Sequence, residues 1–547
     1  MSTSESTAGT GASTSADSYD VVVVGGGPGG STTAALVAMA GHRVLLLEKE
    51  SFPRHQIGES LLPATIHGIC RFLGASEELE KANFMPKRGG TFRWGSNPEP
   101  WNFLFAYSPL MSGATSTAYQ VERMKFDKIL LDNARRLGVD VREQCTADAV
   151  LSEGERITGL RWTDSEGVTH ETAATYVVDA SGSNSRLART VGKRNYSDFF
   201  RNVALYGYYE GGKRLPGPDA GNILCCAWDD GWFWYIPLTD TLTSVGAVVN
   251  RSQVGTLSRD PEAAMAQFIE RAPMIKDYLS DATRVTEGPY GELRVRKDYS
   301  YAMERFWQPG MVLVGDAACF VDPVFSTGVH LATYGGLLAA RSINSALAGD
   351  LDEERAFGEF ERRYRREYGV FYEFLLAFYD MQHNEDSYFW QARKVSRAEA
   401  TDLRAFVELV GGVSAVNSGE SALMDTEALK ERFSASSKDL AGAVDRTGPA
   451  QSESGEQMGE LFGTQVVTDV MQGMNEIQAR ASLGGATTLE RPLFEDGLIA
   501  SPDGLAWSVP ATDAVAAAVE EAVEDAVEDA VDEAVDEAAV AKGSAVG

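Results

Sequence analysis

The sequence has no long apolar run, no cysteine pattern and comparatively few basic residues. No apolar stretch reaches the ~20 residues that a membrane-spanning helix needs, so we expect no membrane partner. The five cysteines are an odd set without C-x-x-C or metal-ligand spacing, which predicts buried thiols and no metal site. The 49 lysines and arginines are outnumbered by 79 acids, and the net charge of −30 argues against a nucleic-acid partner.

The two ends of the chain differ in composition from the rest. Residues 1–18 contain neither a basic region nor an apolar core, so we expect a disordered leader on a cytoplasmic protein. Residues 511–547 carry eleven acids and one lysine within a repeating Ala-Val pattern, which predicts a solvated acidic tail. The chain between them is too long for one compact core, so we expect two or three domains.

The stretch from Tyr19 to Glu48 has the pattern of a dinucleotide-binding βαβ unit. Its predicted parts are a buried strand at Val21–Val24, glycines in G-x-G-x-x-G spacing at Gly25, Gly27 and Gly30, a helix at Ser31–Ala40 and a strand at Arg43–Leu47. Gly25 permits the tight turn, and Gly27 lets backbone N–H groups approach a pyrophosphate. Gly30 lets the helix pack close to the strand. Glu48 is placed to accept from a ribose hydroxyl, so the cofactor is FAD or NAD and not NADP.

Two segments that follow this unit each have two interpretations. Arg54 lies in the loop Ser51–Pro63, where the pair Glu59-Ser60 is either a helix cap or a polar wall of the cofactor site. Arg123 opens a predicted helix and is either a surface charge or a group that reaches a phosphate or the adenine. The residues alone leave both alternatives open.

A third buried strand is predicted at Met311–Val314, followed by Gly315-Asp316. Asp316 is placed to reach a ribityl or sugar hydroxyl. Ser326-Thr327-Gly328 then opens a helix that we expect to start near Val329. Its free N–H groups and dipole suit a flavin carbonyl or a halide ion.

The segment Asn202–Asn250 alternates apolar and polar residues between turns, which predicts an antiparallel sheet. Within it, strand alternation places Trp232 and Trp234 on one face. Phe233 and Tyr235 then lie on the other face. Core packing and an aromatic wall over a planar ligand are equally open. Lys87 precedes an Arg-Gly-Gly turn signal, where composition alone favours a solvent-exposed lysine.

Beyond Glu353 the sequence predicts helices with aromatic stripes at helical spacing. The further predictions are helices at Asp402–Val410 and Thr426–Phe433, a Ser/Gly-rich segment at 434–456, and docking of 491–509 back onto the body.

Three glycine-containing motifs together resemble the FAD domain of the p-hydroxybenzoate hydroxylase-like flavin monooxygenases. They are Gly25-Gly26-Gly27-Pro28-Gly29-Gly30, Gly315-Asp316 and Ser326-Thr327-Gly328. The run from Trp232 to Pro237 resembles the W-x-W-x-I-P signature of flavin-dependent halogenases, and Lys87 is placed like the essential lysine of that family. The implied fold is α/β: a Rossmann-like FAD-binding domain with an inserted antiparallel β-sheet substrate domain and a mostly helical C-terminal region. The predicted boundaries are 19–200 and 301–350 for the FAD domain, 201–300 for the substrate domain, and 351–510 for the helical region.

The resemblance implies a chemistry for these residues. Reduced FAD from a separate flavin reductase reacts with O₂ to give a C4a-hydroperoxide, which oxidises chloride to hypochlorous acid. Lys87 then orients this acid or traps it as a chloramine, and an electron-rich carbon is chlorinated. Chloride would bind near Thr327-Gly328, and Trp232 and Trp234 would keep substrate away from the flavin. The cofactor-binding residues would be Gly25, Gly27, Gly30, Glu48, Arg54, Arg123, Asp316, Ser326 and Gly328.

One residue departs from the tryptophan-specific branch. Those enzymes carry a glutamate immediately before Ser-Thr-Gly, whereas this sequence has Phe325. The resemblance therefore implies a phenolic, tyrosine-derived substrate on a peptidyl carrier protein, in natural-product biosynthesis. The alternatives are an acyl-group halogenase, a monooxygenase that hydroxylates an aromatic substrate, and a flavin-binding scaffold. Asp298 is a carboxylate to inspect for a covalent flavin link.

Overall fold

The computed structural model describes residues 18–94, 100–107, 116–297, 300–380, 492–494 and 496–510. Several sequence predictions lie outside these described residues: almost all of the 1–18 leader, Asp298, the helices at 402–410 and 426–433, the 434–456 segment and the acidic tail.

Strand β1 (Tyr19–Val24) lies at the centre of a parallel sheet. It pairs with β2 (Val44–Leu47) on one side and β10 (Thr169–Asp179) on the other. β20 (Met311–Leu313) continues the sheet beyond β10, and β7 (Asp140–Arg142) continues it beyond β2, both in parallel. The sheet order β20-β10-β1-β2-β7 brings the carboxyl ends of these strands to one edge, where α/β proteins bind ligands. The predicted Rossmann-like unit is confirmed.

Antiparallel strands extend this sheet at two places. β8 (Thr146–Glu153) and β9 (Arg156–Thr163) form a ribbon that pairs with the amino-terminal half of β10. β19 (Trp307–Gln308) pairs with β20.

A second sheet contains β12 (Asn202–Glu210), β15 (Leu242–Asn250), β14 (Gly231–Pro237) and β13 (Ile223–Trp228), each antiparallel to its neighbour. The antiparallel prediction holds for these four strands but misses one edge. There β4 (Gly89–Arg93) pairs in parallel with β13, because this upstream segment enters the sheet in the same direction as β13. β5 (Trp101–Leu104) pairs with the outer side of β4 and forms that edge, and β16 (Thr283–Arg284) and β17 (Arg294–Lys297) pair with β12 at the opposite edge.

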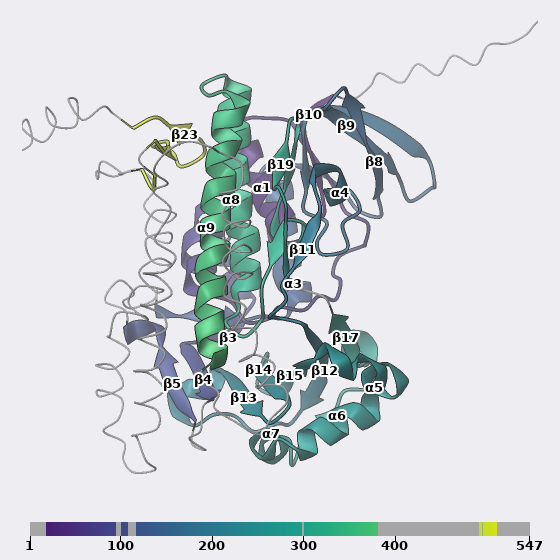
Figure 1. The fold of residues 1–547 in the computed structure, drawn as a ribbon, viewed down its shortest axis with the longest axis vertical. Coiled ribbons are helices and arrows are strands. Elements are labelled where there is room, and N and C mark those ends of the chain that lie inside the picture. Colours follow the sequence, from purple (N-terminus) through teal and green to yellow (C-terminus); the bar gives the residue numbers. More distant parts are fainter. Residues whose placement is uncertain are drawn as a thin grey trace, which may run out of the picture.

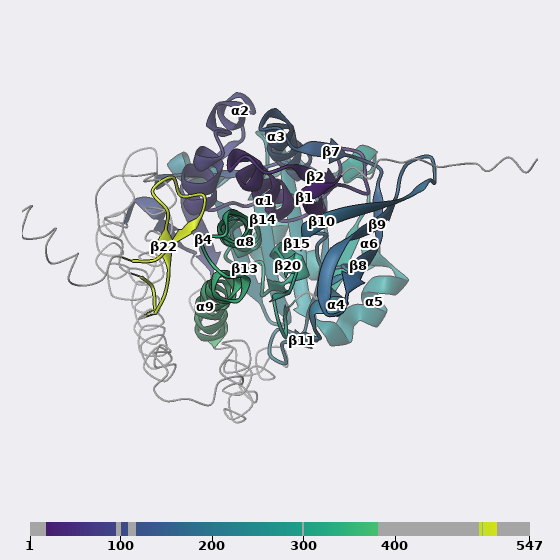
Figure 2. The ribbon, with the colours of Figure 1, turned by 90° about the horizontal axis from the view of Figure 1, so that it is seen from above.

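Helices cover the two sheets from different sides. α3 (Arg123–Arg136), α1 (Pro28–Met39), α8 (Thr327–Ala348) and α9 (Glu353–Asp380) form a row beside the parallel sheet, seen end-on in Figure 2. The outer face of the second sheet packs against α5 (Val254–Arg259), α6 (Pro261–Glu270) and α7 (Pro273–Tyr278), at the foot of the molecule in Figure 1. The inner face of that sheet belongs to the same core as the row of helices.

Short elements complete the described chain. The hairpin β22 (Ile499–Ala500) and β23 (Trp507–Ser508) docks on α8, where Trp507 donates from its backbone N to Ser345 Oγ and from Nε1 to Ser342 Oγ, 2.8 Å each. This confirms the predicted docking for the described part of 491–509. The remaining elements are a π-helical turn (Ala64–Cys70), α2 (Ser76–Lys81), β3 (Met85–Lys87), β6 (Ala118–Gln120), α4 (Ala188–Val191), β11 (Arg194–Tyr196), β18 (Tyr301–Met303), β21 (Cys319–Phe320) and 3₁₀ turns such as Gly315–Ala317.

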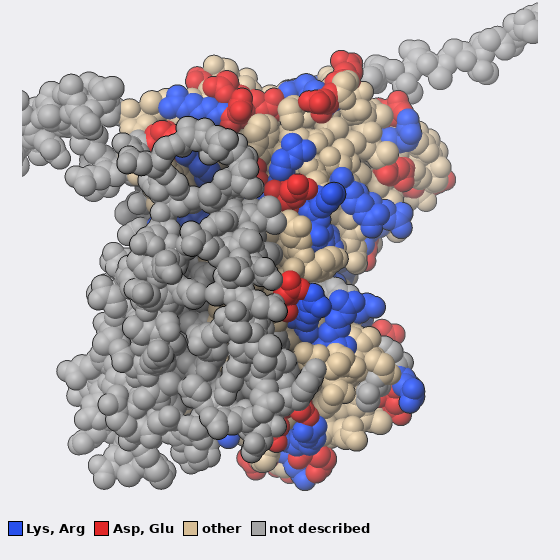
Figure 3. All heavy atoms as spheres, in the orientation of Figure 1, with Lys and Arg blue, Asp and Glu red and all other residues tan. Residues whose placement is uncertain are grey.

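Side-chain chemistry across the fold gives three further observations. All five cysteines are buried with free thiols, as predicted. Within the described ranges, no helix is long and apolar enough to cross a membrane, and no His, Cys, Asp or Glu cluster has metal-binding geometry. Despite the net charge of −30, basic side chains gather along the flank of β11 and β17 in Figure 3.

Candidate functional site

The glycines after β1 shape a tight turn into α1. Gly25 has a φ of +105°, and a Cβ there would lie 2.4 Å from the Ala180 carbonyl oxygen. A Cβ on Gly30 would lie 1.9 Å from the Gly25 carbonyl oxygen, so only glycine allows the helix this close to the strand. Gly27 is different: a Cβ there would meet only Arg54 Nη2, at 3.5 Å. The space above Gly27, at the start of α1, is therefore open for a ligand.

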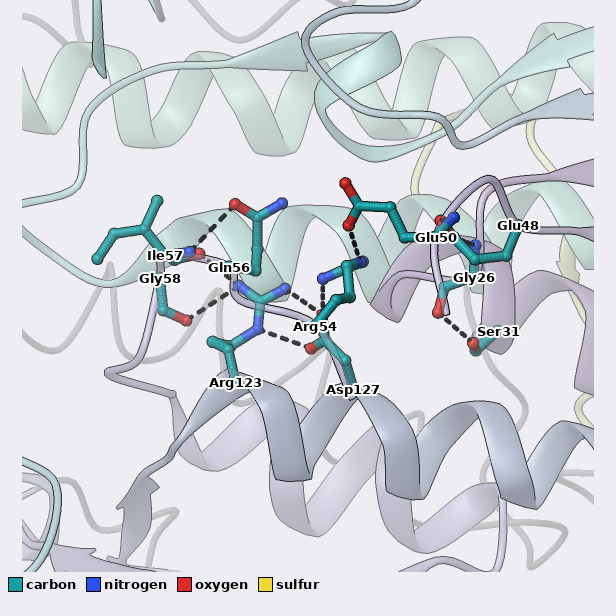
Figure 4. Close-up of polar contacts among 10 residues, drawn as sticks. All are labelled: Gly26, Ser31, Glu48, Glu50, Arg54, Gln56, Ile57, Gly58, Arg123 and Asp127. Carbon is teal, nitrogen blue, oxygen red and sulfur yellow. Dashed lines mark hydrogen bonds and ion pairs between the residues drawn. The ribbon is translucent and has the colours of Figure 1, made fainter. Parts of the chain in front are cut away.

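Glu48 follows directly after β2 and turns back towards these glycines. Its Oε2 accepts from the Gly26 backbone N at 2.7 Å, and its Oε1 accepts from the Glu50 backbone N at 2.9 Å. Figure 4 shows this carboxylate beside the glycine turn. Each carboxylate oxygen can accept a second hydrogen bond, so the side chain is fixed in place and still able to bind a hydroxyl.

Arg54 and Arg123 share one buried carboxylate, that of Asp127 (Figure 4). Arg54 Nη1 donates to Asp127 Oδ2 at 3.0 Å, and Arg123 donates from Nε to Oδ1 at 2.7 Å and from Nη2 to Oδ2 at 2.9 Å. Arg123 Nη1 also donates hydrogen bonds to the backbone carbonyls of Ile57 and Gly58, at 2.6 and 3.2 Å. The interpretation of Arg123 as a helix-surface charge is therefore wrong. Asp127 was missed in the sequence, although its i, i+4 spacing from Arg123 was the available signal.

Replacing Asp127 by alanine should destabilise the protein by about 3–5 kcal/mol, because the buried Arg123 would lose its ion-pair partner and Arg54 would keep only Glu50, at 3.5 Å, among the described residues. Urea unfolding would measure this loss. The matched control is Asp132→Ala on the same helix, where the carboxylate is half-exposed and pairs with Lys128 and Arg135. That change should cost less than about 1 kcal/mol. Equal losses for the two variants would contradict the role given to Asp127.

Lys87 ends the short strand β3 and is almost completely buried, with 2% of its surface exposed. Its Nζ donates to the Leu61 carbonyl at 2.9 Å and to Ser326 Oγ at 3.3 Å, and lies 5.5 Å from the centre of the Phe105 ring. Burial lowers the pKa of Lys87 to about 7. The compositional expectation of a solvent-exposed lysine is wrong, because pairing of β3 with β6 draws this residue inside.

The residues around Ser326 form the start of α8. The helix begins at Thr327, two residues before the predicted start, and Ser326 precedes it with a left-handed φ of 63°. The Oγ1 of Thr327 is buried and has no hydrogen-bond partner among the described residues. A Cβ on Gly328 would lie 2.7 Å from the Phe320 ring, so glycine is needed for close packing there. Phe325 lies among aromatic rings, 5.7 Å from Phe92 and 4.6 Å from Phe378 between centroids.

Trp232 and Trp234 share one face of β14, with Phe233 and Tyr235 on the other, as predicted. Trp232 Nε1 donates to Tyr379 Oη at 2.7 Å, and Trp234 Nε1 donates to Ser244 Oγ at 3.2 Å. The ring of Trp234 covers Gly246 on the neighbouring strand, where a Cβ would clash at 2.2 Å. Both indoles are thus fixed in orientation on the inner face of the sheet.

Asp316 lies in the 3₁₀ turn that follows β20. Its backbone carbonyl accepts from Tyr301 Oη, and its Oδ2 lies 3.9 Å from Arg296 Nη2. The carboxylate is about one-third exposed and free to meet a hydroxyl at the carboxyl edge of the parallel sheet.

These residues fall into two groups joined by one segment. The glycine turn, Glu48 and Arg54 lie at the start of α1, whereas Lys87 and Ser326 lie at the start of α8. The segment 54–61 connects them, because Arg54 approaches Gly27 and the Leu61 carbonyl accepts from Lys87. The open position at Gly27 and the unpartnered Thr327 Oγ1 fit a long ligand with an anionic middle, which is the shape and charge of FAD.

Comparison with known proteins agrees with this geometry. The family model for tryptophan halogenases matches residues 20–113 and 107–435. Tryptophan 2-halogenase from Chondromyces crocatus is 32% identical over 383 residues, covering 69% of this chain and 71% of that protein. A 1H-pyrrole-2-carbonyl-(peptidyl-carrier protein) chlorinase from Pseudomonas fluorescens is 32% identical over 66% of this chain and 83% of that protein.

Solved structures give the same result. The myxobacterial chondrochloren halogenase CndH, described as a variant of FAD-dependent halogenases, is 52% identical. The match covers 90% of this chain and 99% of that one, with a TM-score of 0.70. The flavin-dependent halogenase CmlS is 28% identical, with 90% of this chain covered, 84% of that chain covered and a TM-score of 0.68. The chain therefore belongs to the flavin-dependent halogenase family and is an FAD-dependent enzyme.

Proposed function

We propose that this enzyme chlorinates a phenolic, tyrosine-derived substrate tethered to a peptidyl carrier protein, in natural-product biosynthesis, through Lys87. The observation that carries the proposal is the environment of Lys87: a buried amine, held at 2.9 Å by the Leu61 carbonyl, whose pKa burial lowers to about 7. At neutral pH such an amine exists in both protonation states. It can donate hydrogen bonds to hypochlorous acid as an ammonium or take up chlorine as a free base.

The residues at the start of α1 would hold the FAD. Gly25, Gly27 and Gly30 leave room for the pyrophosphate above the helix N-terminus. Glu48 would accept from the ribose, and Asp316 from a ribityl hydroxyl, since both carboxylates keep free lone pairs. Arg54 and Arg123 would place positive charge beside the cofactor, in an orientation set by Asp127.

The start of α8 would bind the flavin ring and chloride. Reduced FAD, supplied by a separate flavin reductase, provides with O₂ the oxidising power that turns chloride into electrophilic chlorine. The first-turn N–H groups of a 22-residue helix and the unpartnered Thr327 hydroxyl are suitable donors for a chloride ion. Ser326 and Gly328 would contact the flavin from the same turn. Because Ser326 Oγ also accepts from Lys87 Nζ, chloride would be oxidised close to the Lys87 amine.

Trp232 and Trp234 would exclude the substrate from the flavin. Their indoles are fixed by hydrogen bonds to Tyr379 and Ser244, so they form a rigid wall on the inner face of the second sheet. A substrate that cannot touch the flavin is chlorinated by the diffusing oxidant and is not hydroxylated.

The substrate class rests on two observations. Phe325, packed against Phe92 and Phe378, provides no carboxylate beside Lys87, so the substrate ring must itself be strongly nucleophilic, as a phenol is ortho to its hydroxyl. One relative acts on a pyrrole carried by a peptidyl carrier protein, which supports a tethered substrate.

Mass spectrometry of tyrosyl-loaded carrier protein tests this proposal. With enzyme, FAD, a flavin reductase, O₂ and chloride, the tethered tyrosyl group should gain the isotope pattern of chlorine. Free tyrosine should react at least about tenfold more slowly, since it lacks the carrier's binding energy. Free tryptophan is the matched control and should remain unchanged. Preferential chlorination of free tryptophan, or oxygenation without halide, would overturn the proposed substrate.

A further inference from the structure

A buried hydrogen-bonded chain lies on the segment that joins the two halves of the site. Glu59 has 1% of its surface exposed, and its Oε1 accepts from Tyr208 Oη at 2.8 Å. The same Tyr208 oxygen lies 2.8 Å from Nε2 of His55, which is partly exposed to solvent. The second carboxylate oxygen, Glu59 Oε2, is buried and makes no hydrogen bond of ordinary geometry among the described residues, although the Ser244 side chain faces the carboxyl group. The chain thus runs from the partly exposed His55 to a buried carboxyl group inside the protein.

The ionisation of the three groups suits proton movement near neutral pH. Burial raises the pKa of Glu59 to about 7 and lowers that of His55 to about 4, while burial also keeps Tyr208 protonated by raising its pKa. His55 is therefore a neutral imidazole that can donate from one nitrogen and accept at the other. The other charged and titratable groups that face this chain are Arg54 on its loop, Glu122 and Arg123 at the start of α3, Tyr206 on β12, Tyr290 after β16 and Arg294 on β17.

Chlorination consumes protons. With reduced FAD written as its monoanion, the balance is FADH⁻ + O₂ + Cl⁻ + ArH + 2 H⁺ → FAD + ArCl + 2 H₂O. Dioxygen takes up four electrons: two come from the reduced flavin, and two from the replacement of an aryl C–H bond by C–Cl. Each turnover therefore requires two protons from outside the site.

We propose that His55, Tyr208 and Glu59 form a proton relay that supplies this site from solvent; the inference rests on the chlorinating function proposed above. A proton moves from His55 Nε2 to Tyr208 Oη as the phenol proton moves to Glu59 Oε1, and His55 Nδ1 takes a proton from water. Rotation of the carboxyl group then moves the proton to the side that faces Ser244. Glu59 lies on the same segment as Leu61, whose carbonyl accepts from Lys87 Nζ at 2.9 Å.

The sharpest test is Tyr208→Phe, because it removes one hydroxyl and leaves the ring packed against His55 and Tyr290. The matched control is Tyr206→Phe, on the same face of the same strand, since no hydrogen bond of the Tyr206 hydroxyl is seen in the described structure. In the free protein, infrared spectroscopy after mixing with D₂O would follow exchange of the Glu59 carboxyl proton, with the band assigned by its loss in Glu59→Gln. We expect exchange at least about tenfold slower in Tyr208→Phe than in Tyr206→Phe. Equal exchange rates in the two variants would overturn the relay.

Turnover gives a second measurement. We expect Tyr208→Phe to lower kcat for chlorination about 100-fold and to enlarge the solvent deuterium isotope effect, with FAD affinity unchanged by flavin fluorescence. Tyr206→Phe should keep both values near those of the unmodified enzyme. An unchanged isotope effect in Tyr208→Phe would also overturn the relay. Absence of chlorinated product from the unmodified enzyme would instead overturn the proposed function, and the carboxyl exchange in free protein would still decide the relay.

Discussion

Replacing Lys87 by methionine should raise the free energy of unfolding by about 3 kcal/mol at pH 6. Burial lowers the pKa of this amine from 10.5 to about 7. Below the folded pKa, carrying the ammonium therefore costs the folded state about 5 kcal/mol relative to the unfolded chain. Methionine removes this penalty but leaves the Leu61 carbonyl and the Ser326 hydroxyl unpartnered, at roughly 1 kcal/mol each.

The pH dependence identifies the cause of this gain. The penalty is fully present below the folded pKa of about 7 and disappears as the pH rises towards the unfolded value of 10.5. The gain from Lys87→Met should therefore shrink steadily in urea unfolding at pH 6, 7.5 and 9. The control is Lys49→Met at an exposed lysine, which should change stability by less than about 0.5 kcal/mol at each pH. If the gain in stability of Lys87→Met over the unmodified protein were smallest at pH 6, the buried amine with a lowered pKa would be contradicted.

Gly27→Ala should weaken FAD binding by about tenfold or more while the protein stays folded. A Cβ at this position meets only Arg54 Nη2, at 3.5 Å, and the backbone φ of −71° suits alanine. The methyl group would instead occupy the space through which a pyrophosphate approaches the N–H groups of α1. Losing one charge-assisted hydrogen bond there costs about 1.5–3 kcal/mol of binding. Flavin fluorescence measures the affinity, and urea unfolding should show a loss of less than about 1 kcal/mol.

Gly30→Ala is the matched comparison within the same motif. Its Cβ would lie 1.9 Å from the Gly25 carbonyl oxygen, so α1 would have to move away from β1. We expect this variant to lose about 3 kcal/mol or more of stability before any effect on FAD is considered. If Gly27→Ala bound FAD normally, or if both variants unfolded alike, the division of roles between these glycines would be wrong.

The parts of the fold that could be predicted are those encoded by neighbouring residues. The strand at Val21–Val24, the glycines after it and the acid that ends the next strand lie within thirty residues. A short apolar run that ends in regularly spaced glycines can be recognised from these neighbouring residues alone. The alternation of Trp232 and Trp234 with their neighbours follows in the same way from strand geometry. These local patterns identified the β1–α1–β2 unit and the second sheet, although α1 begins at Pro28, three residues before the predicted start at Ser31.

The features that escaped prediction depend on pairing between distant segments. Lys87 is buried by contacts with Leu61 and Ser326, which are 26 and 239 residues away, and nothing in its neighbours indicates this. The parallel pairing of β4 with β13 arises from a similar long-range meeting. The early start of α8 at Thr327 depends on the left-handed conformation of Ser326, a residue type that rarely adopts it.

The central claim is that Lys87 directs chlorine from the flavin site to the substrate. The most direct measurement compares the amount of chlorinated phenol formed per reduced FAD oxidised by the unmodified enzyme and by Lys87→Met, both saturated with FAD. We predict chlorinated product from the unmodified enzyme. For the variant we predict at least about a thousandfold less, while FAD is still oxidised and the oxidant is lost to solvent. Chlorination by Lys87→Met at the unmodified ratio would contradict the account.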